Sequence, residues 1–429
     1  MRVLVKGGRV LDPEPGLDDF REVLIEDGRI VDLVRPGGEG DFGAAAEIIN
    51  VNGLLVTPGL IDLHVHLREP GEEYKETIAS GTLAAAAGGF TAVACMPNTK
   101  PVADERSVIE FILRTADRAG SARVWPVAAM TKGRLGEELC EYWDLAEAGA
   151  VGVSDDGCWV PDSRLMRHIL EYARLFNLLP ISHAEDSSLS GNGVMNEGPV
   201  STRLGLRGLP SAAEDTAVFR DLRLAQLTGC PVHIAHVSTK GAVEIIRQAK
   251  ASGVPVTAET APHYFTLTEA AVAGYRTEAK MNPPLRSAQD VAAIKEGLAD
   301  GTIDAVATDH APHSMMEKDV EFDLAANGIV GLETALALTL ELVNQKVLSL
   351  RRVVELLSQA PARILGLPGG NLKPGQEADL TVIDLNRRWR VEPSEFKSKG
   401  RNTPFTGLNL VGRAVLTMLR GRPTYNILP

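Results

Sequence analysis

Short apolar runs alternate with longer amphipathic segments through the middle of the chain. Eight runs have the length and composition of strands: Leu54–His66, Thr91–Met96, Arg123–Ala128, Ala150–Asp155, Leu179–His183, Val232–His236, Val254–Glu259 and Ala305–Asp309. Segments between them carry apolar residues at helical spacing, namely Tyr74–Ala87, Glu105–Ala119, Ser163–Phe176, Ser211–Thr228, Gly241–Ser252 and Ala288–Asp300. Strands and helices in this alternation predict a (β/α)₈ TIM-type barrel. An open doubly wound sheet is the alternative, and the absence of a Gly-x-Gly-x-x-Gly motif after the first strand disfavours it.

Both ends of the chain show a different pattern, in which short strands are separated by tight turns. Near the N-terminus, residues 3–11 contain a Gly-Gly turn, and residues 22–31 predict a hairpin with Asp27-Gly28 at its turn. Near the C-terminus, residues 378–385 and 413–421 are further strand candidates. We therefore predict an α/β protein in which residues 55–370 form the barrel. Residues 1–54 and 371–429 are predicted to build one small β-sandwich domain together.

Composition excludes several classes of protein. The chain has 429 residues, of which 44% are hydrophobic, so it can bury a large core. Its formal net charge of −12 argues against nucleic-acid binding, which usually requires a basic face. The four cysteines form no Cys-x-x-Cys motif, as in a reduced cytosolic protein. Because we find neither a secretory signal nor an apolar run of membrane-spanning length, we expect a cytoplasmic protein without membrane or nucleic-acid contacts.

Histidines and acidic residues gather at the predicted strand ends. Those that end or directly follow a strand are His64, His66, His183, His236, His310, the Asp155-Asp156 pair and Asp309. Since the carboxyl ends of barrel strands surround one mouth, these side chains should converge there. His64 and His66 are two positions apart, so on a strand both point to the same side and can bind one ion. Imidazole and carboxylate donors without thiolate favour zinc over manganese or cobalt.

Each of these residues taken singly has an ordinary structural interpretation, such as a satisfied strand-end histidine or an aspartate that caps a helix. His233, in the opposite strand phase from His236, is assigned such a role. The combination of histidines and carboxylates instead predicts a hydrolytic metal site. There we expect a metal-activated hydroxide to attack an amide carbonyl. Asp309, also a ligand, is expected to act as general acid/base between the attacking water and the leaving nitrogen.

Longer motifs around these residues resemble those of class I dihydroorotases in the amidohydrolase superfamily, and the resemblance covers essentially the whole chain. The motifs are Pro58–Gly71, Met96–Thr99, Ser154–Gly157, Ala235–Thr239, Met281–Arg286 and Thr308–His313. The resemblance implies reversible, zinc-dependent cyclisation of N-carbamoyl-L-aspartate to L-dihydroorotate in de novo pyrimidine biosynthesis. It also implies a homodimer and, as in some relatives, a complex with aspartate transcarbamoylase.

The resemblance also assigns residues. It implies that His64 and His66 bind one zinc ion and that His183 and His236 bind a second, so one or two ions are expected. Many superfamily members bridge the metals with a carboxylated lysine, but here Asp155-Asp156 occupies that strand end; we predict Asp156 as the ligand and keep Asp155 as the alternative. Arg68 is expected to clamp the substrate carboxylate with a bidentate fork. The full set of implied substrate contacts is His66, Arg68, Asn98, Asn282, His313, Asn327 and Gly328.

Some positions depart from the family pattern or leave alternatives open. Asn327 stands where relatives often have Phe, and Tyr264 where they often have His, so neither His263 nor Tyr264 receives a ligand role. Residues 314–326 form either a lid beside the mouth or a solvated surface loop.

A hydantoinase or allantoinase is disfavoured by the missing lysine and by the His-Leu-Arg and Met-Pro-Asn-Thr motifs. An inactive structural partner of aspartate transcarbamoylase is disfavoured because every expected ligand is present.

Overall fold

The computed structural model describes residues 2–36 and 47–428, and its centre is a nearly closed barrel of parallel strands. In order these are β6 (Leu60–Val65), β7 (Phe90–Cys95), β8 (Arg123–Ala128), β9 (Gly152–Val153), β10 (Leu179–Ser182), β13 (Val232–Ile234), β14 (Val256–Thr260) and β15 (Ala305–Val306). The two ends of this sheet meet at the carboxyl rim, where Val65 bridges His310 and the His66 N–H donates to the His310 carbonyl at 2.8 Å. The predicted barrel is confirmed.

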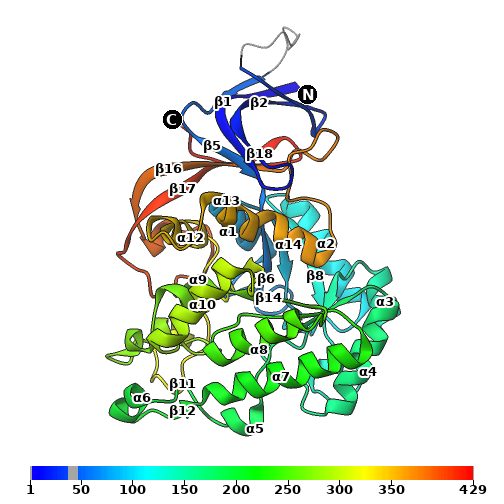
Figure 1. Ribbon diagram of the computed structural model, residues 1–429, viewed down its shortest axis with the longest axis vertical. Helices are drawn as coiled ribbons and strands as arrows, with labels where there is room; N and C mark the ends of the chain where they lie inside the picture. Colours follow the sequence, from blue (N-terminus) through cyan, green and yellow to red (C-terminus); the bar gives the residue numbers. More distant parts are fainter. Residues whose placement is uncertain (1, 37–46, 429) are drawn as a thin grey trace.

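Helices cover the outside of the barrel (Figure 1). The longer ones are α1 (Ile78–Gly88), α2 (Arg106–Ala119), α4 (Ser163–Leu175), α7 (Ser211–Thr228), α8 (Lys240–Ala251), α10 (Ala288–Asp300) and α12 (Ala335–Asn344). Shorter ones are α3 (Tyr142–Glu147), α5 (Ser187–Ser190), α6 (Pro199–Leu204), α9 (Pro262–Thr266), α11 (Met315–Lys318), α13 (Leu350–Val354) and α14 (Ala360–Leu365). The first helix begins at Ile78 rather than Tyr74 because the Thr77 hydroxyl caps it, accepting from the Ser80 N–H at 3.1 Å. No helix of the described residues is long and apolar enough to cross a membrane.

Alternation along the strands divides the apolar residues between two cores. On β7, Val93 joins the cluster packed under the helices, whereas Ala92 and Ala94 join a second cluster with Ile181 and Ala305. Because strands from all round the barrel contribute to that second cluster, it fills the barrel interior. The barrel interior is therefore filled by side chains below its carboxyl rim.

Strands from both chain ends form one mixed sheet at one end of the molecule, close to both termini (Figure 1). They are β1 (Arg2–Asp12), β2 (Leu17–Glu26), β3 (Arg29–Val34), β4 (Glu47–Asn50), β5 (Leu55–Pro58), β16 (Leu380–Arg390), β17 (Asn409–Leu419) and β18 (Arg422–Asn426). Side chains from both halves of this sheet, such as Val23 on β2 and Met418 on β17, pack into one apolar cluster of their own. A two-residue pair, β11 (Met195–Asn196) and β12 (Gly208–Leu209), lies outside both sheets.

The single strand predicted over Leu54–His66 is wrong, because the chain changes sheets within it. β5 pairs with β1 and β16 in the terminal sheet, whereas β6 pairs with β7 in the barrel. The break falls at Pro58-Gly59, where proline has no N–H to donate and the Gly59 N–H binds the Asp379 carbonyl at 2.9 Å. A Cβ at residue 59 would lie 2.1 Å from Thr91 Oγ1, so only glycine fits between the two sheets.

Candidate metal centre

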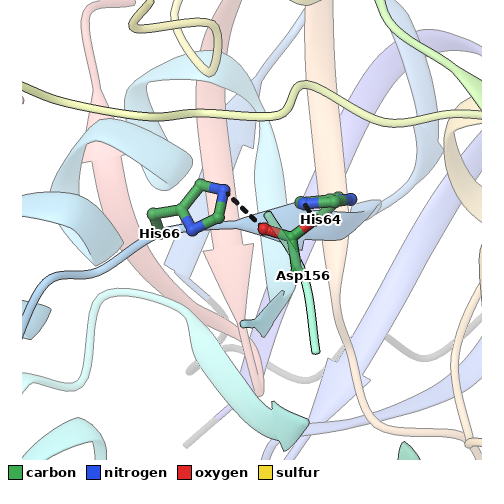
Figure 2. Close-up of side chains that lie close together, drawn as sticks. All are labelled: His64, His66 and Asp156. Carbon is green, nitrogen blue, oxygen red and sulfur yellow. Dashed lines mark ion pairs between the residues drawn. The ribbon is translucent and has the colours of Figure 1, made fainter. Parts of the chain in front are cut away.

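Side chains from the strand ends do converge at the carboxyl rim of the barrel. The ligand atoms of His64, His66 and Asp156 lie within 4.8 Å of one another, and those of Asp156, His183 and His236 form a second such group. The two groups share Asp156. As expected for alternate strand residues, the His64 and His66 rings are neighbours, with centroids 5.3 Å apart (Figure 2).

The carboxylate of Asp156 stands among four imidazoles. Its Oδ1 lies 3.2 Å from His64 Nε2 and its Oδ2 lies 3.5 Å from His66 Nε2 (Figure 2). The same Oδ1 is 3.5 Å from both His183 Nδ1 and His236 Nε2. Asp155 faces the other way, and its Oδ1 accepts from the backbone N–H groups of residues 130 and 131 at 2.9 and 3.1 Å. Of the two aspartates between which the sequence left a choice, Asp156 is the one at the cluster.

Asp309 lies at the same rim, opposite Asp156. Its Oδ1 is 3.1 Å from His66 Nε2 and 3.7 Å from His64 Nε2. Burial raises the pKa of this carboxyl, but the hydrogen bond from His66 and the charges of the neighbouring histidines outweigh it and lower the pKa. Its φ of 49° is unusual for a residue other than glycine, and strained backbone of this kind gathers at functional sites. Asp309 is therefore held as a carboxylate against the two histidines of the first strand.

Two buried carboxylates behind the cluster were missed in the sequence. Glu259 Oε1 accepts from His64 Nδ1 at 3.1 Å, and its Oε2 lies 3.3 Å from His233 Nε2. Asp62 accepts from the His64 and Thr308 N–H groups at 3.1 and 3.0 Å, tying the first strand to the segment that carries Asp309. The signal available was an acidic residue inside an apolar strand, since such a residue is seldom buried without a partner.

The donor set fits a divalent cation. Among the described residues, the cluster brings together histidine nitrogens and carboxylate oxygens, and each of the six residues is at most 7% exposed. Because Glu259 binds the Nδ1 side of His64, the Nε2 atom of that ring is the nitrogen that faces the cluster, and it has no hydrogen-bond partner among the described residues. Unpartnered buried polar atoms are rare, so this nitrogen is best explained as a metal ligand. The two overlapping groups have room for one or two ions.

A cavity of about 190 Å³ opens above the cluster. It is lined by every residue that the resemblance assigned to the substrate, namely His66, Arg68, Asn98, Asn282, His313, Asn327 and Gly328. Asn98 Oδ1 accepts from His66 Nδ1 at 2.8 Å, and Asn282 Nδ2 donates to His183 Nε2 at 3.4 Å. These two amides therefore orient ligand histidines as well as facing the cavity.

Arg68 and His313 form the wall on one side of this cavity. The guanidinium of Arg68 is buried, and its Nε donates to the Pro312 carbonyl at 3.2 Å. Burial, together with the positive charge of Arg68, lowers the pKa of His313 to about 3, so the ring is neutral. Its Nε2 donates to the Asn327 carbonyl at 2.7 Å. The Pro312 carbonyl is neutral, and no carboxylate of the described residues lies within ion-pair distance of the Arg68 guanidinium.

Other histidines and Tyr264 stay outside the metal cluster, as the sequence suggested for most of them. His233 lies between Glu259 and Thr257, with 2.8 Å from its Nδ1 to Thr257 Oγ1. His310, counted among the strand-end histidines, faces away: its Nε2 lies 3.4 Å from Glu76 Oε2 and its Nδ1 accepts from the Gly331 N–H at 3.1 Å. Tyr264 donates to the Pro283 carbonyl at 2.6 Å.

Comparison with known proteins agrees with this site. A family model described as dihydro-orotase-like matches residues 53–242, and one described as amidohydrolase family matches residues 281–425. The dihydroorotase of Syntrophotalea carbinolica is 57% identical over 427 residues, covering 100% of both chains, and that of Geotalea daltonii is 56% identical over 423 residues, covering 98% of this chain and 99% of the other. Among solved structures, L-hydantoinase (dihydropyrimidinase) from Arthrobacter aurescens superposes with a TM-score of 0.88 at 27% identity, covering 99% of this chain and 96% of that one.

Proposed function

The chain belongs to the dihydroorotase family of amidohydrolases, and we propose that its metal centre interconverts N-carbamoyl-L-aspartate and L-dihydroorotate, a step of de novo pyrimidine biosynthesis. The observation that carries this proposal is the buried cluster of histidines and aspartates at the base of a cavity that also contains the buried cation Arg68. The cluster of histidines and aspartates can act on a ring amide, and Arg68 can bind the carboxylate of the same ring.

We assign the cluster to zinc, with His64 and His66 binding one ion, His183 and His236 a second, and Asp156 shared between them. Asp309 completes the set of six candidate ligands. Nitrogen and oxygen donors in a closed, buried arrangement suit zinc. When bound, the metal supplies a Lewis acid that polarises the amide carbonyl and lowers the pKa of a water molecule.

Asp309 moves the proton in this proposal. In ring opening, its carboxylate takes the proton from the attacking water and delivers it to the ring nitrogen as the amide bond breaks. In cyclisation, the same carboxylate removes the proton from the ureido nitrogen as that nitrogen attacks the side-chain carboxyl carbon, and it protonates the departing oxygen. Its pKa is lowered, so the group is ionised and able to accept the proton.

The remaining lining residues orient the substrate. The planar guanidinium of Arg68 can bind the carboxylate substituent of the dihydroorotate ring with two hydrogen bonds, and burial strengthens that interaction. Asn98, His313, Asn282, Asn327 and Gly328 line the same cavity, and His313 lies between Arg68 and Asn327: its Nε2 is 3.3 Å from Arg68 Nη2 and donates to the Asn327 carbonyl at 2.7 Å. The substrate is thus held between Arg68 and the metal cluster.

A hydantoinase is the second candidate, because L-hydantoinase from Arthrobacter aurescens shares the fold over nearly the whole chain. Sequence identity to the dihydroorotases is about twice as high, and it extends over the full length. Turnover of L-dihydroorotate and of hydantoin by the purified protein separates the two candidates. It also tests the inactive-partner alternative, since such a protein would turn over neither.

The central experiment measures zinc content and dihydroorotate turnover before and after chelation, in wild type and in His64→Ala. We expect the variant to lose zinc and nearly all turnover, and we expect zinc to restore the chelated wild type. His168→Ala, on the exposed face of α4, is the matched control and should behave like wild type. Wild-type zinc and turnover in His64→Ala would discard the assigned site.

We further propose a cytoplasmic homodimer that is able to bind aspartate transcarbamoylase, and residues 55–370 as the catalytic domain with residues 1–54 and 371–429 as the second domain. Support comes from the family resemblance, the cysteine pattern and the separate apolar cluster of the terminal sheet. Sedimentation of the purified chain, alone and with aspartate transcarbamoylase, tests the assembly.

A further inference from the structure

A buried lysine lies behind one edge of the substrate cavity. Lys318, the last residue of α11, is 5% exposed, yet it forms no ion pair with any described carboxylate. Its Nζ instead donates to three backbone carbonyls, those of Lys280 at 3.2 Å, Ala326 at 2.7 Å and Gly328 at 3.0 Å. An ammonium has three donors, so all of them are used. Burying such a group is costly, and the cost is offset only because these contacts are made.

The three carbonyls surround the Asn327–Gly328 edge of the cavity. Gly328 N–H donates to the Lys280 carbonyl at 3.0 Å, and the Asn402 side chain donates to the Gly328 carbonyl at 3.0 Å. Gly328 has a φ of 124°, and a Cβ there would lie 2.5 Å from Ala311 Cβ. The backbone N–H of Asn327 has no acceptor within the described part of the chain, so it is free to bind a ligand oxygen.

Space behind this edge makes the polar contacts important. A second cavity of about 340 Å³ is lined by Lys318, Met315, Asn402 and His313, and His313 also lines the substrate cavity. Close packing therefore does not by itself keep the edge in place. Without the lysine, three carbonyls would lose a donor and the edge would have room to move away from the ligand.

The neighbouring residue fixes the other side of α11. Glu317 Oε1 lies 2.9 Å from Lys75 Nζ and accepts from the Tyr74 hydroxyl at 3.1 Å. Both partners belong to the loop that begins at Arg68, where the Glu72 N–H donates to the Arg68 carbonyl at 2.9 Å. Residues 314–326 therefore connect the Arg68 wall of the cavity to the Asn327–Gly328 edge, through Glu317 on one side and Lys318 on the other.

We propose that Lys318 is a positioning residue, whose ammonium group cross-links three backbone carbonyls and holds the Asn327–Gly328 edge against the substrate. The identity of that substrate rests on the proposed function, whereas the cross-link itself does not. The lysine touches neither the metal ligands nor the reacting atoms, so it acts on substrate binding and leaves metal loading unchanged.

The charge of Lys318 is adjustable. Its pKa is lowered to about 7, mainly by burial and also by the charge of Lys280, while Glu278 and Glu317 act in the opposite direction. His313 also faces it, and the ammonium in turn lowers the pKa of that ring. A neutral amine has two N–H donors instead of three, so one carbonyl loses its partner. The KM for dihydroorotate should therefore rise as the pH increases through about 7.

The test compares Lys318→Met and Lys318→Arg with Lys373→Met, a control at an exposed lysine of the terminal domain, all in the zinc-loaded protein. Hydrogen exchange of the peptide covering residues 324–330 is measured without substrate, and KM and kcat are measured with dihydroorotate. For Lys318→Met we expect about tenfold faster exchange and an about tenfold higher KM, with kcat and zinc content close to wild type. Lys373→Met should change none of these quantities.

Each outcome decides one question. Wild-type exchange in Lys318→Met overturns the cross-link, and faster exchange with an unchanged KM overturns its role in substrate binding. If the wild type turns over no dihydroorotate, the proposed function fails while the exchange result still judges the cross-link. If Lys318→Met does not fold, Lys318→Arg tests the proposal instead. Arginine stays charged, so the rise of the KM above pH 7 should disappear in this variant. A rise that persists overturns the proposal.

Discussion

Replacing Glu259 should weaken metal binding although Glu259 is not a metal ligand. Its carboxylate is 1% exposed and lies between His64 Nδ1 at 3.1 Å and His233 Nε2 at 3.3 Å. Burial raises its pKa, but hydrogen bonds from His233 and His64 lower it to about 2, so it is ionised at neutral pH. By holding the Nδ1–H of His64, it turns the Nε2 atom of that ring toward the ligand cluster, 3.2 Å from Asp156 Oδ1.

The magnitude follows from what each substitution removes. Glu259→Gln keeps one acceptor oxygen but loses the negative charge, and its amide nitrogen can no longer accept from the second histidine. Outer-shell partners of ligand histidines typically contribute about 10–100-fold in metal affinity, which corresponds to about 1.4–2.8 kcal/mol. We place Glu259→Gln near the lower end of that range. Glu259→Leu removes both acceptors and belongs near the upper end.

Zinc affinity is measured by competition with a chromophoric chelator, and thermal unfolding of each metal-free variant reports folding separately. Glu269→Gln is the control, since Glu269 also accepts a side-chain hydrogen bond, from Asn196 at 2.6 Å, but belongs to neither ligand group. Zinc affinity should fall from wild type to Glu259→Gln to Glu259→Leu, and Glu269→Gln should match wild type. Equal zinc affinity in all four proteins would refute the argument that Glu259 sets the orientation of His64.

Two further predictions concern the substrate and the core. Arg68→Met should raise the KM for dihydroorotate at least about tenfold, because the charge-assisted pair between the guanidinium and the substrate carboxylate is lost, and the zinc content should not change. Steady-state kinetics and metal analysis measure both quantities. An unchanged KM would show that Arg68 does not bind the substrate. Ile246→Ala, at a fully buried position of α8, should cost about 2–5 kcal/mol of unfolding free energy. Leu175→Ala, at a 72% exposed position, should stay within about 0.5 kcal/mol, and denaturant titration compares the two.

The barrel could be predicted because its signals are local. Strand candidates such as Arg123–Ala128 and helix candidates such as Ser211–Thr228 and Ala288–Asp300 coincide with β8, α7 and α10. The strand is a short continuous apolar run, as in parallel sheets that are buried on both faces, whereas the buried residues of α7 recur at helical spacing. The convergence of His64 and His236 followed from a topological rule, namely that parallel barrel strands end at one rim.

What could not be predicted depends on contacts between distant segments. Pro58-Gly59 is a local signal for the break within Leu54–His66, but nothing in residues 54–66 records that β5 pairs with Leu380–Arg390 in another sheet. Glu259 and Lys318 are single polar residues in ordinary surroundings along the sequence. Their significance lies in the groups opposite them, His64 in one case and three backbone carbonyls in the other, and those partners are known only when the chain is folded.

The shared fold does not explain which cyclic amide this site selects. The metal cluster acts on the amide, and an amide is present in both hydantoin and dihydroorotate. Selection must therefore come from groups that meet the rest of the ring. Hydantoin has no ring carboxylate, so binding it would bury the Arg68 guanidinium without an anionic partner, which is a large energetic cost. The Asn327–Gly328 edge, held by Lys318, bounds the same cavity and contacts the Arg68 wall through His313. Substrate choice is thus set by residues outside the metal centre, on two loops that α11 connects.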